Sequence, residues 1–318
     1  MPTPLPDPRT SPRFAGLVTF GRYPRFEDTT EPIDWAIFGV PYDTGVTYRP
    51  GARFGPRAIR EQSQYLKRYS LAHEIDICDA LTMADAGDAP VHPYHPKRTL
   101  DAVCEFAADL GSAETRTLAL GGDHSIAYAN IKATWIRQGK PSEGLPLIHF
   151  DSHLDTVDTI WDERYTHASP FIRLIEEGVI DPARTLTVGI KGPLNTADDL
   201  DYGRKRGIEV LTYDRWRDEG EAPITEFVRR LQGESTYCTF DIDCVDPVYA
   251  PGTGTPSVGG FTSAEALGLV RAMRGAHLIG ADVVEVLPDR DVAGNTALLA
   301  AHIAFELLCI DALHRRGG

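Results

Sequence analysis

The chain has few basic side chains, few cysteines and no long uninterrupted apolar run. Its 318 residues include 32 lysines and arginines against 46 aspartates and glutamates, which gives a formal net charge of −14. A nucleic-acid-binding surface needs a basic stripe, so this balance argues against one. The acidity is compatible with a cationic small molecule as partner, although net charge mainly reports solubility.

Cysteine is scarce and shows no metal-cluster spacing. The five cysteines are unclustered, and most lie in apolar or strand-like stretches: Cys78, Cys104, Cys238, Cys244 and Cys309. This pattern predicts buried free thiols and a reducing cytoplasm. The N-terminus has prolines where a signal peptide needs an apolar core, and no run approaches the ~20 apolar residues of a membrane span. We therefore expect a cytoplasmic protein that binds neither nucleic acid nor membrane.

What the sequence does contain is a regular alternation of short apolar runs and amphipathic segments. Residues 1–30, rich in proline and arginine, predict an irregular arm. Strands are expected at Trp35–Val40, Thr117–Leu120, Leu147–Phe150, Thr185–Gly189, Glu209–Tyr213, Tyr237–Phe240 and His277–Ala281. Helices are expected at Gly55–Leu66, Leu100–Leu110, Ser125–Arg137, Asp198–Arg206, Ile224–Leu231, Ser263–Met273 and Asn295–His314. The alternation predicts a three-layer α/β/α fold with a mainly parallel sheet, and residues 1–318 show no linker or repeat, so we expect one domain.

Polar clusters follow four of the predicted strands. They are Gly121-Gly-Asp-His-Ser125, Asp151-Ser-His-Leu-Asp155, Asp241-Ile-Asp-Cys-Val-Asp-Pro247 and Asp282-Val-Val-Glu285. Ligands gather beyond the carboxyl ends of parallel strands, so these clusters are expected to meet at one edge of the sheet.

The clustered carboxylates indicate a site for two metal ions. Asp151, His153 and Asp155 alternate, so in extended geometry their side chains would point the same way, and Asp241 and Asp243 repeat the spacing. Four carboxylates would repel one another unless cations neutralised them. Any one of these motifs alone also fits turn chemistry, and a lone His124 also fits a core histidine. All three motifs, each behind a strand, favour two divalent ions ~3.5–4 Å apart.

These motifs, in this order, resemble the ureohydrolase (arginase/agmatinase) family. Further segments resemble its agmatinase branch: Gly39-Val-Pro-Tyr-Asp43, Arg49-Pro-Gly-Ala-Arg-Phe-Gly-Pro56, Pro251-Gly-Thr-Gly-Thr-Pro256 and Val284-Glu-Val-Leu-Pro288. The resemblance covers the chain from about residue 14 onward. It implies an arginase-like fold and a homo-oligomer, trimeric or hexameric.

The resemblance also implies a ligand set. One ion would be held by His124, Asp151, Asp155 and Asp241, and the other by Asp151, His153, Asp241 and Asp243, so that Asp151 and Asp241 bridge. Manganese is favoured, and nickel is the alternative, because oxygen-rich sites with two imidazoles tolerate either.

The implied reaction is hydrolysis of a small cationic guanidino compound, such as agmatine or 4-guanidinobutyrate, to urea and an amine. The ion pair would lower the pKa of a shared water to produce a strong nucleophile. Glu285 would hold the guanidinium, and Asp155 would carry a proton to the leaving amine with His167 as its shuttle. Without the resemblance, Glu285 also fits a capped strand-end carboxylate and His167 a surface-loop histidine.

Two residues depart from the family pattern, and both lie beside the expected site. Ser152 replaces the usual alanine and could tune the ligands, whereas Ala168 replaces the usual glycine and would narrow the pocket or shift its loop. His149 is expected to be a packed core residue, and His92 and His95 are assigned no role.

The loop Thr156–Thr166 is expected to recognise the substrate tail. An amine tail would favour Asp158, Asp162 or Glu163, and a carboxylate tail would favour Arg164. Free guanidine would favour Trp161 stacking beside Ala168. One alternative function is therefore a guanidine hydrolase. Two others are a formimino-compound hydrolase and a non-catalytic partner subunit, and such a subunit would be expected to lack metal ligands.

Overall fold

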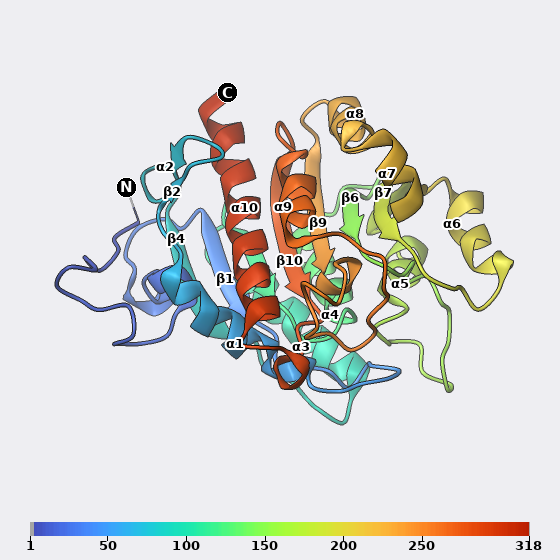
Figure 1. Cartoon of the computed structure of the whole chain (residues 1–318), viewed down its shortest axis with the longest axis horizontal. Helices are drawn as coiled ribbons and strands as arrows, with labels where there is room; N and C mark the ends of the chain where they lie inside the picture. Colours follow the sequence, from blue (N-terminus) through green and yellow to red (C-terminus); the bar gives the residue numbers. More distant parts are fainter. Residues whose placement is uncertain (1–2, 318) are drawn as a thin grey trace.

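The computed structural model describes residues 3–317, and an eight-stranded sheet forms its centre (Figure 1). The strand order is β4-β1-β5-β10-β9-β6-β7-β8, and every neighbouring pair is parallel. The strands are β1 (Trp35–Gly39), β4 (Met83–Asp88), β5 (Arg116–Leu120), β6 (Leu145–Phe150), β7 (Ile180–Ile190), β8 (Glu209–Thr212), β9 (Ser235–Asp241) and β10 (His277–Val284). The expected three-layer α/β/α architecture is confirmed.

Helices cover both faces of the sheet. Figure 1 shows α10, α9 and α8 in front of it and α3 and α4 behind it. The helices are α1 (Gly55–Gln62), α2 (Ile77–Ala80), α3 (Pro96–Asp109), α4 (Ile126–Arg137), α5 (Pro170–Glu176), α6 (Asp201–Arg206), α7 (Tyr213–Glu219), α8 (Ala222–Leu231), α9 (Ser263–Arg271) and α10 (Asn295–Gly317). Short 3-10 turns join several of them, among them η6 (Ile242–Cys244).

Side-chain alternation along the strands divides the interior into two cores. In β1, Trp35 and Ile37 pack in the core shared with α10, whereas Ala36 and Phe38 pack in the core shared with α3 and α4. All five residues of β1 are buried, as expected for a central parallel strand with helices on both faces.

Helix α10 has the length and apolar composition of a membrane-crossing segment, contrary to the expectation that no run comes close. However, 83% of its 18-residue apolar window is buried inside the molecule. Its polar members are also used internally, because Asp311 accepts a hydrogen bond from Trp35 Nε1 at 2.7 Å. α10 is therefore a core helix.

The N-terminal arm is irregular over the described residues 3–32 apart from two 3-10 turns, η1 (Phe20–Arg22) and η2 (Phe26–Asp28). Thr3 anchors its start by donating from Oγ1 to the carbonyl of Leu81 at 2.6 Å. A separate antiparallel pair, β2 (Tyr69–Ser70) and β3 (Ile75–Asp76), lies outside the main sheet.

All seven expected strands and all seven expected helices are present, with ends shifted by a few residues. Among the described residues, six strands and α-helices were not expected: β2, β3, β4, α2, α5 and α7. The strand expected at Thr185–Gly189 is longer and begins at Ile180, and the segment expected as a helix at Asp198–Arg206 is a 3-10 turn followed by α6.

Candidate metal centre

Four adjacent strands, β5, β10, β9 and β6, bring the expected polar clusters to one edge of the sheet. His124 lies in the turn between β5 and α4, Asp241 is the last residue of β9, and Glu285 directly follows β10. The turn after β5 passes so close to another segment that a Cβ on Gly122 would lie 2.2 Å from the carbonyl oxygen of Tyr42. Glycine is therefore required at that position for the turn to place His124 here.

His124 is surrounded by three carboxylates. Its Nδ1 lies 3.0 Å from Asp151 Oδ2, 2.9 Å from Asp155 Oδ2 and 3.2 Å from Asp241 Oδ2. On the other side of the ring, Nε2 lies 2.9 Å from the hydroxyl of Thr239 and can donate to it, which leaves a lone pair on Nδ1. Nδ1 is buried and forms no hydrogen bond with any described residue. One imidazole nitrogen facing three oxygens fits a divalent cation.

His153 forms a second group beside the first. Its Nδ1 lies 3.1 Å from Asp243 Oδ2 and 3.4 Å from Asp151 Oδ1. Asp151 thus faces both histidines with its two oxygens. The donors of these two groups match the types that two neighbouring divalent ions need. The six expected ligands therefore converge.

The carboxylates of the cluster strongly perturb one another. Burial, with repulsion from neighbouring carboxylates, raises the pKa of Asp155 and raises that of Asp241 well above its usual range. Burial would also raise the pKa of Asp151, but the imidazoles of His124, His149 and His153 beside it hold it well below the ordinary value. Bound cations would relieve this repulsion.

The extended geometry expected for Asp151–Asp155 is wrong. The segment bends after Asp151, and Asp155 has a positive φ of 50°. Such a φ is uncommon outside glycine and is maintained only where the surroundings enforce it. The bend turns Asp155 towards His124 and His153 towards Asp243.

Glu285 and His167 lie next to the cluster as a hydrogen-bonded pair. Glu285, with a φ of 64°, accepts on Oε1 from the backbone N–H of His124 at 2.9 Å and from His167 Nδ1 at 3.0 Å. Glu285 Oε2 is buried and has no hydrogen-bond partner among the described side chains and backbone. This oxygen is free to bind a ligand.

Thr47, from the loop after β1, fixes the ring of His167. Its backbone N–H donates to Nε2 at 3.1 Å, which favours the neutral ring with the proton on Nδ1. Burial alone would lower the pKa of His167, but the hydrogen bond and charge of Glu285 raise it to about 9, which favours a charged ring with a proton on both nitrogens. A proton on Nε2 would face the Thr47 N–H, so the contact geometry, in which Nε2 accepts, indicates the neutral ring. The sequence gives no local signal for this role of Thr47, because the two residues are 120 positions apart.

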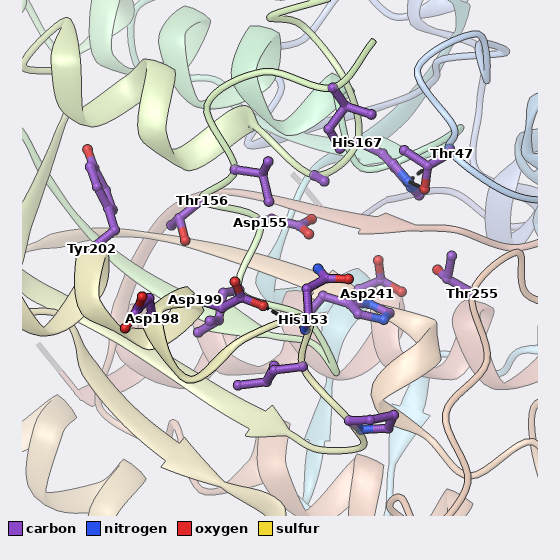
Figure 2. A pocket seen from close by; sticks show the side chains of 17 residues that line it. Thr47, His153, Asp155, Thr156, His167, Asp198, Asp199, Tyr202, Asp241 and Thr255 are labelled. Carbon is purple, nitrogen blue, oxygen red and sulfur yellow. Dashed lines mark hydrogen bonds between the residues drawn. The ribbon is translucent and has the colours of Figure 1, made fainter.

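A cavity of about 440 Å³ leads to the cluster (Figure 2). Figure 2 shows His153, Asp241 and His167 at one end and Tyr202 and Asp198 at the other. Further lining residues are Thr47, Leu154, Asp155, Thr156, Val157, Ile160, Ala168, Pro193, Leu194, Asn195, Asp199 and Thr255. Within the described part of the chain, no lysine or arginine lines this cavity.

Only one of the six residues expected to read the substrate tail, Ala168, lines the cavity. Asp158 is engaged by Arg173, and Arg164 pairs with Glu176 at 3.1 Å, so ion pairs outside the cavity occupy both. Trp161 is 79% exposed in a turn closed by mutual backbone hydrogen bonds between residues 160 and 163. The loop therefore meets the cavity through Thr156, Val157 and Ile160 instead.

Two neighbours of the expected ligands were also not foreseen. His149 is buried, as expected for a core residue, yet its Nε2 lies 2.8 Å from Asp151 Oδ2. Thr255 donates to Asp243 Oδ2 at 3.0 Å. For His149 the signal was its place in β6 two residues before Asp151, because alternate residues of an extended segment point to the same side.

Comparison of the sequence and the fold with known proteins identifies the family of the chain. The model of the Arginase family matches residues 33–309. A guanidinopropionase from Pseudomonas aeruginosa is 42% identical over 311 residues, 97% of this chain and 96% of its own. Proclavaminate amidinohydrolase from Streptomyces clavuligerus superposes with a TM-score of 0.89 at 37% identity, covering 96% of this chain and 100% of that one. A hypothetical agmatinase from Burkholderia thailandensis gives 0.85 at 38% identity, covering 96% and 94%. The resemblance is confirmed, and the chain belongs to the arginase family.

Proposed function

We propose that the chain is a binuclear-metal amidinohydrolase that cleaves the guanidino group of a small guanidino compound to urea and an amine. The observation that carries this proposal is the position of two buried, unpartnered atoms. His124 Nδ1 faces three carboxylates, and Glu285, whose Oε2 has no partner, is hydrogen-bonded through Oε1 to the backbone N–H of His124. The relatives support the reaction type, because their names identify a guanidinopropionase, an amidinohydrolase and an agmatinase.

The six converging side chains would hold two divalent ions. His124, Asp151, Asp155 and Asp241 would bind one, and Asp151, His153, Asp241 and Asp243 the other. When bound, the ions supply an activated water as nucleophile. Four carboxylates with two imidazoles suit manganese, which we propose as the resident metal, and the same donors also accept nickel.

Glu285 would bind the guanidinium. Its Oε1 is occupied by the backbone N–H of His124 and by His167, so Oε2 is the oxygen that can accept from the substrate. A charge-assisted hydrogen bond from a guanidinium to a carboxylate is stronger than a neutral one. Because Glu285 is anchored to His124, the substrate carbon would be held in a fixed position relative to the metal ligands.

The proton for the leaving amine would pass through Asp155. In the tautomer that Thr47 favours, the ring proton of His167 faces Glu285. His167 therefore first orients Glu285, and its expected role as proton shuttle requires Nε2 to separate from Thr47.

The cavity wall favours a substrate tail without negative charge. Asp198 and Asp199 line it, and no lysine or arginine does so among residues 3–317. A carboxylate tail would therefore lack a counter-charge in the lining, whereas an ammonium tail would not. The relatives' names include both kinds of substrate, so the preference proposed here rests on the lining of this chain alone.

A urea-release assay tests the function. Purified protein, stripped of metal and reloaded with manganese or nickel, is given agmatine, 4-guanidinobutyrate, 3-guanidinopropionate, guanidine and arginine. Urea is expected, with agmatine above the guanidino acids. Urea from a guanidino acid alone would overturn the tail assignment, and no urea from any compound in ion-loaded protein would overturn the function.

The remaining expectations are proposals of the same kind. We propose one folding unit over residues 1–318, a cytoplasmic location and a trimer or hexamer. Light scattering on the purified protein measures the assembly, and a monomer at micromolar concentration would contradict it.

A further inference from the structure

Lys191 lies beside the carboxylate cluster but takes no part in the site described above. It follows the end of β7, and its Nζ lies 2.6 Å from Ser152 Oγ, 3.0 Å from the carbonyl oxygen of Asp243 and 2.8 Å from that of Ser257. An ammonium group has three N–H donors, so this one is fully used by three neutral oxygens. Lys191 therefore holds backbone and hydroxyl groups instead of binding a carboxylate ligand directly.

Ser152 connects Lys191 to Asp243. Its side chain is fully buried. Its hydroxyl accepts from Lys191 and donates to the carbonyl of Asp243 at 2.7 Å, and its backbone N–H donates to Asp243 Oδ1 at 3.2 Å. These hydrogen bonds join the loop after β6 to Asp243 in the turn after β9.

The absence of a side chain at Gly260 leaves space for the side chain of Lys191. A Cβ on Gly260 would lie 2.4 Å from Lys191 Cε and 2.6 Å from the carbonyl oxygen of Cys244. Real Cβ atoms do not approach other heavy atoms this closely, so any larger residue would displace the lysine. The three oxygen atoms around Nζ and the space left by Gly260 together fix the position of the ammonium group.

We infer that Ser152 and Lys191 are positioning residues that fix Asp243 for the ion bound by Asp151, His153, Asp241 and Asp243. This inference rests on the proposed function, because it presumes that those residues bind an ion. Groups that orient metal ligands typically change metal affinity 10–100-fold when removed. The ammonium charge opposes cation binding, so the benefit comes from orientation of Asp243.

The test measures ion binding without any assay of urea. Metal-stripped wild-type protein and the Ser152→Ala variant are titrated with manganese by calorimetry, and melting of the stripped proteins checks their folding. In Ser152→Ala we expect the Kd of one ion to rise about 10–100-fold and that of the other to stay within a few-fold. Ser63→Ala is the matched control, since Ser63 is an equally buried, hydrogen-bonded serine outside the cluster.

A second variant separates orientation from charge. Lys191→Gln removes the positive charge and at least one of the three hydrogen bonds. Weaker binding of the same ion supports positioning, and tighter or unchanged binding overturns it. An unchanged pair of Kd values in Ser152→Ala also overturns the inference, whereas wild-type protein that binds no manganese or nickel would instead overturn the proposed function.

Discussion

The backbone N–H of His124 donates to Glu285 Oε1 at 2.9 Å, so the carboxylate beyond β10 is anchored to the turn beyond β5. Because His124 Nδ1 faces the carboxylates of the proposed ion site, this bond keeps the proposed guanidinium acceptor at a fixed place relative to that site. Both atoms are buried, and the positive φ of Glu285 shows that the backbone adopts an unfavourable conformation to reach this position.

Replacing Glu285 by Gln is expected to separate substrate binding from metal binding. The amide keeps the shape of the side chain but loses the charge that attracts a guanidinium. We expect kcat/KM for urea release to fall about 10²–10³-fold. Metal content should stay at the wild-type value, since Glu285 is not among the six proposed ligands. Near-normal activity would show that the guanidinium binds elsewhere.

Replacing Asp241 by Asn tests its proposed bridging role. Loss of one negative charge between the two ion groups should lower the metal content per chain and reduce activity by more than about 100-fold. Elemental analysis after gel filtration measures the content. An active variant with wild-type metal content would rule out bridging by this residue.

Replacing Ala168 by Gly is expected to widen the substrate range. Ala168 is not among the described residues with positive φ, so replacing the usual glycine by alanine does not strain the backbone of this loop. Only the size of its methyl group in the cavity wall remains. One methyl group corresponds to about 0.8 kcal/mol, so kcat/KM for bulkier guanidino compounds should rise about fourfold. An unchanged panel of substrates would remove Ala168 from the specificity argument.

His277, far from the metal centre, is expected to make the protein sensitive to acid. Burial lowers its pKa, and the nearby charges of Arg116 and His314 lower it further. The folded state thus favours the neutral ring, whose Nε2 lies 3.0 Å from the Arg116 guanidinium. The neutral ring of His277 contributes fully to the free energy of unfolding above the ordinary histidine pKa. This contribution is lost as the pH falls through the lowered pKa of the folded state. Chemical denaturation of wild type and His277→Gln between pH 7.5 and 5 measures this, and equal slopes against pH would contradict it.

The sequence predicted the central strands, and the side chains that gather at one edge of the sheet, because both signals are local. A buried parallel strand is a continuous apolar run, as in Leu147–Phe150, and the residue that follows it reaches the binding edge of the sheet whatever the loop geometry. This is why Asp151, Asp241 and Glu285 were identified correctly as members of one cluster although the extended geometry assumed for Asp151–Asp155 was wrong.

The elements that were missed lack a local signal. Strand β4 (MADAGD) ends in residues typical of a turn, and its place in the sheet depends on pairing with β1. Helix α5 has its first six residues buried and so shows no amphipathic period. The contacts of Lys191 and Thr47 join segments far apart in the chain, and the ion pairs that occupy Asp158 and Arg164 depend on the position of α5. Such contacts follow from packing and are not encoded in any short motif.

The most direct test of the account is a crystal structure of manganese-loaded protein, with anomalous diffraction recorded at the manganese edge. We predict two anomalous peaks per chain. One should lie among His124, Asp151, Asp155 and Asp241, and the other among Asp151, His153, Asp241 and Asp243. Crystals of active, loaded protein with no peak among these side chains would contradict it.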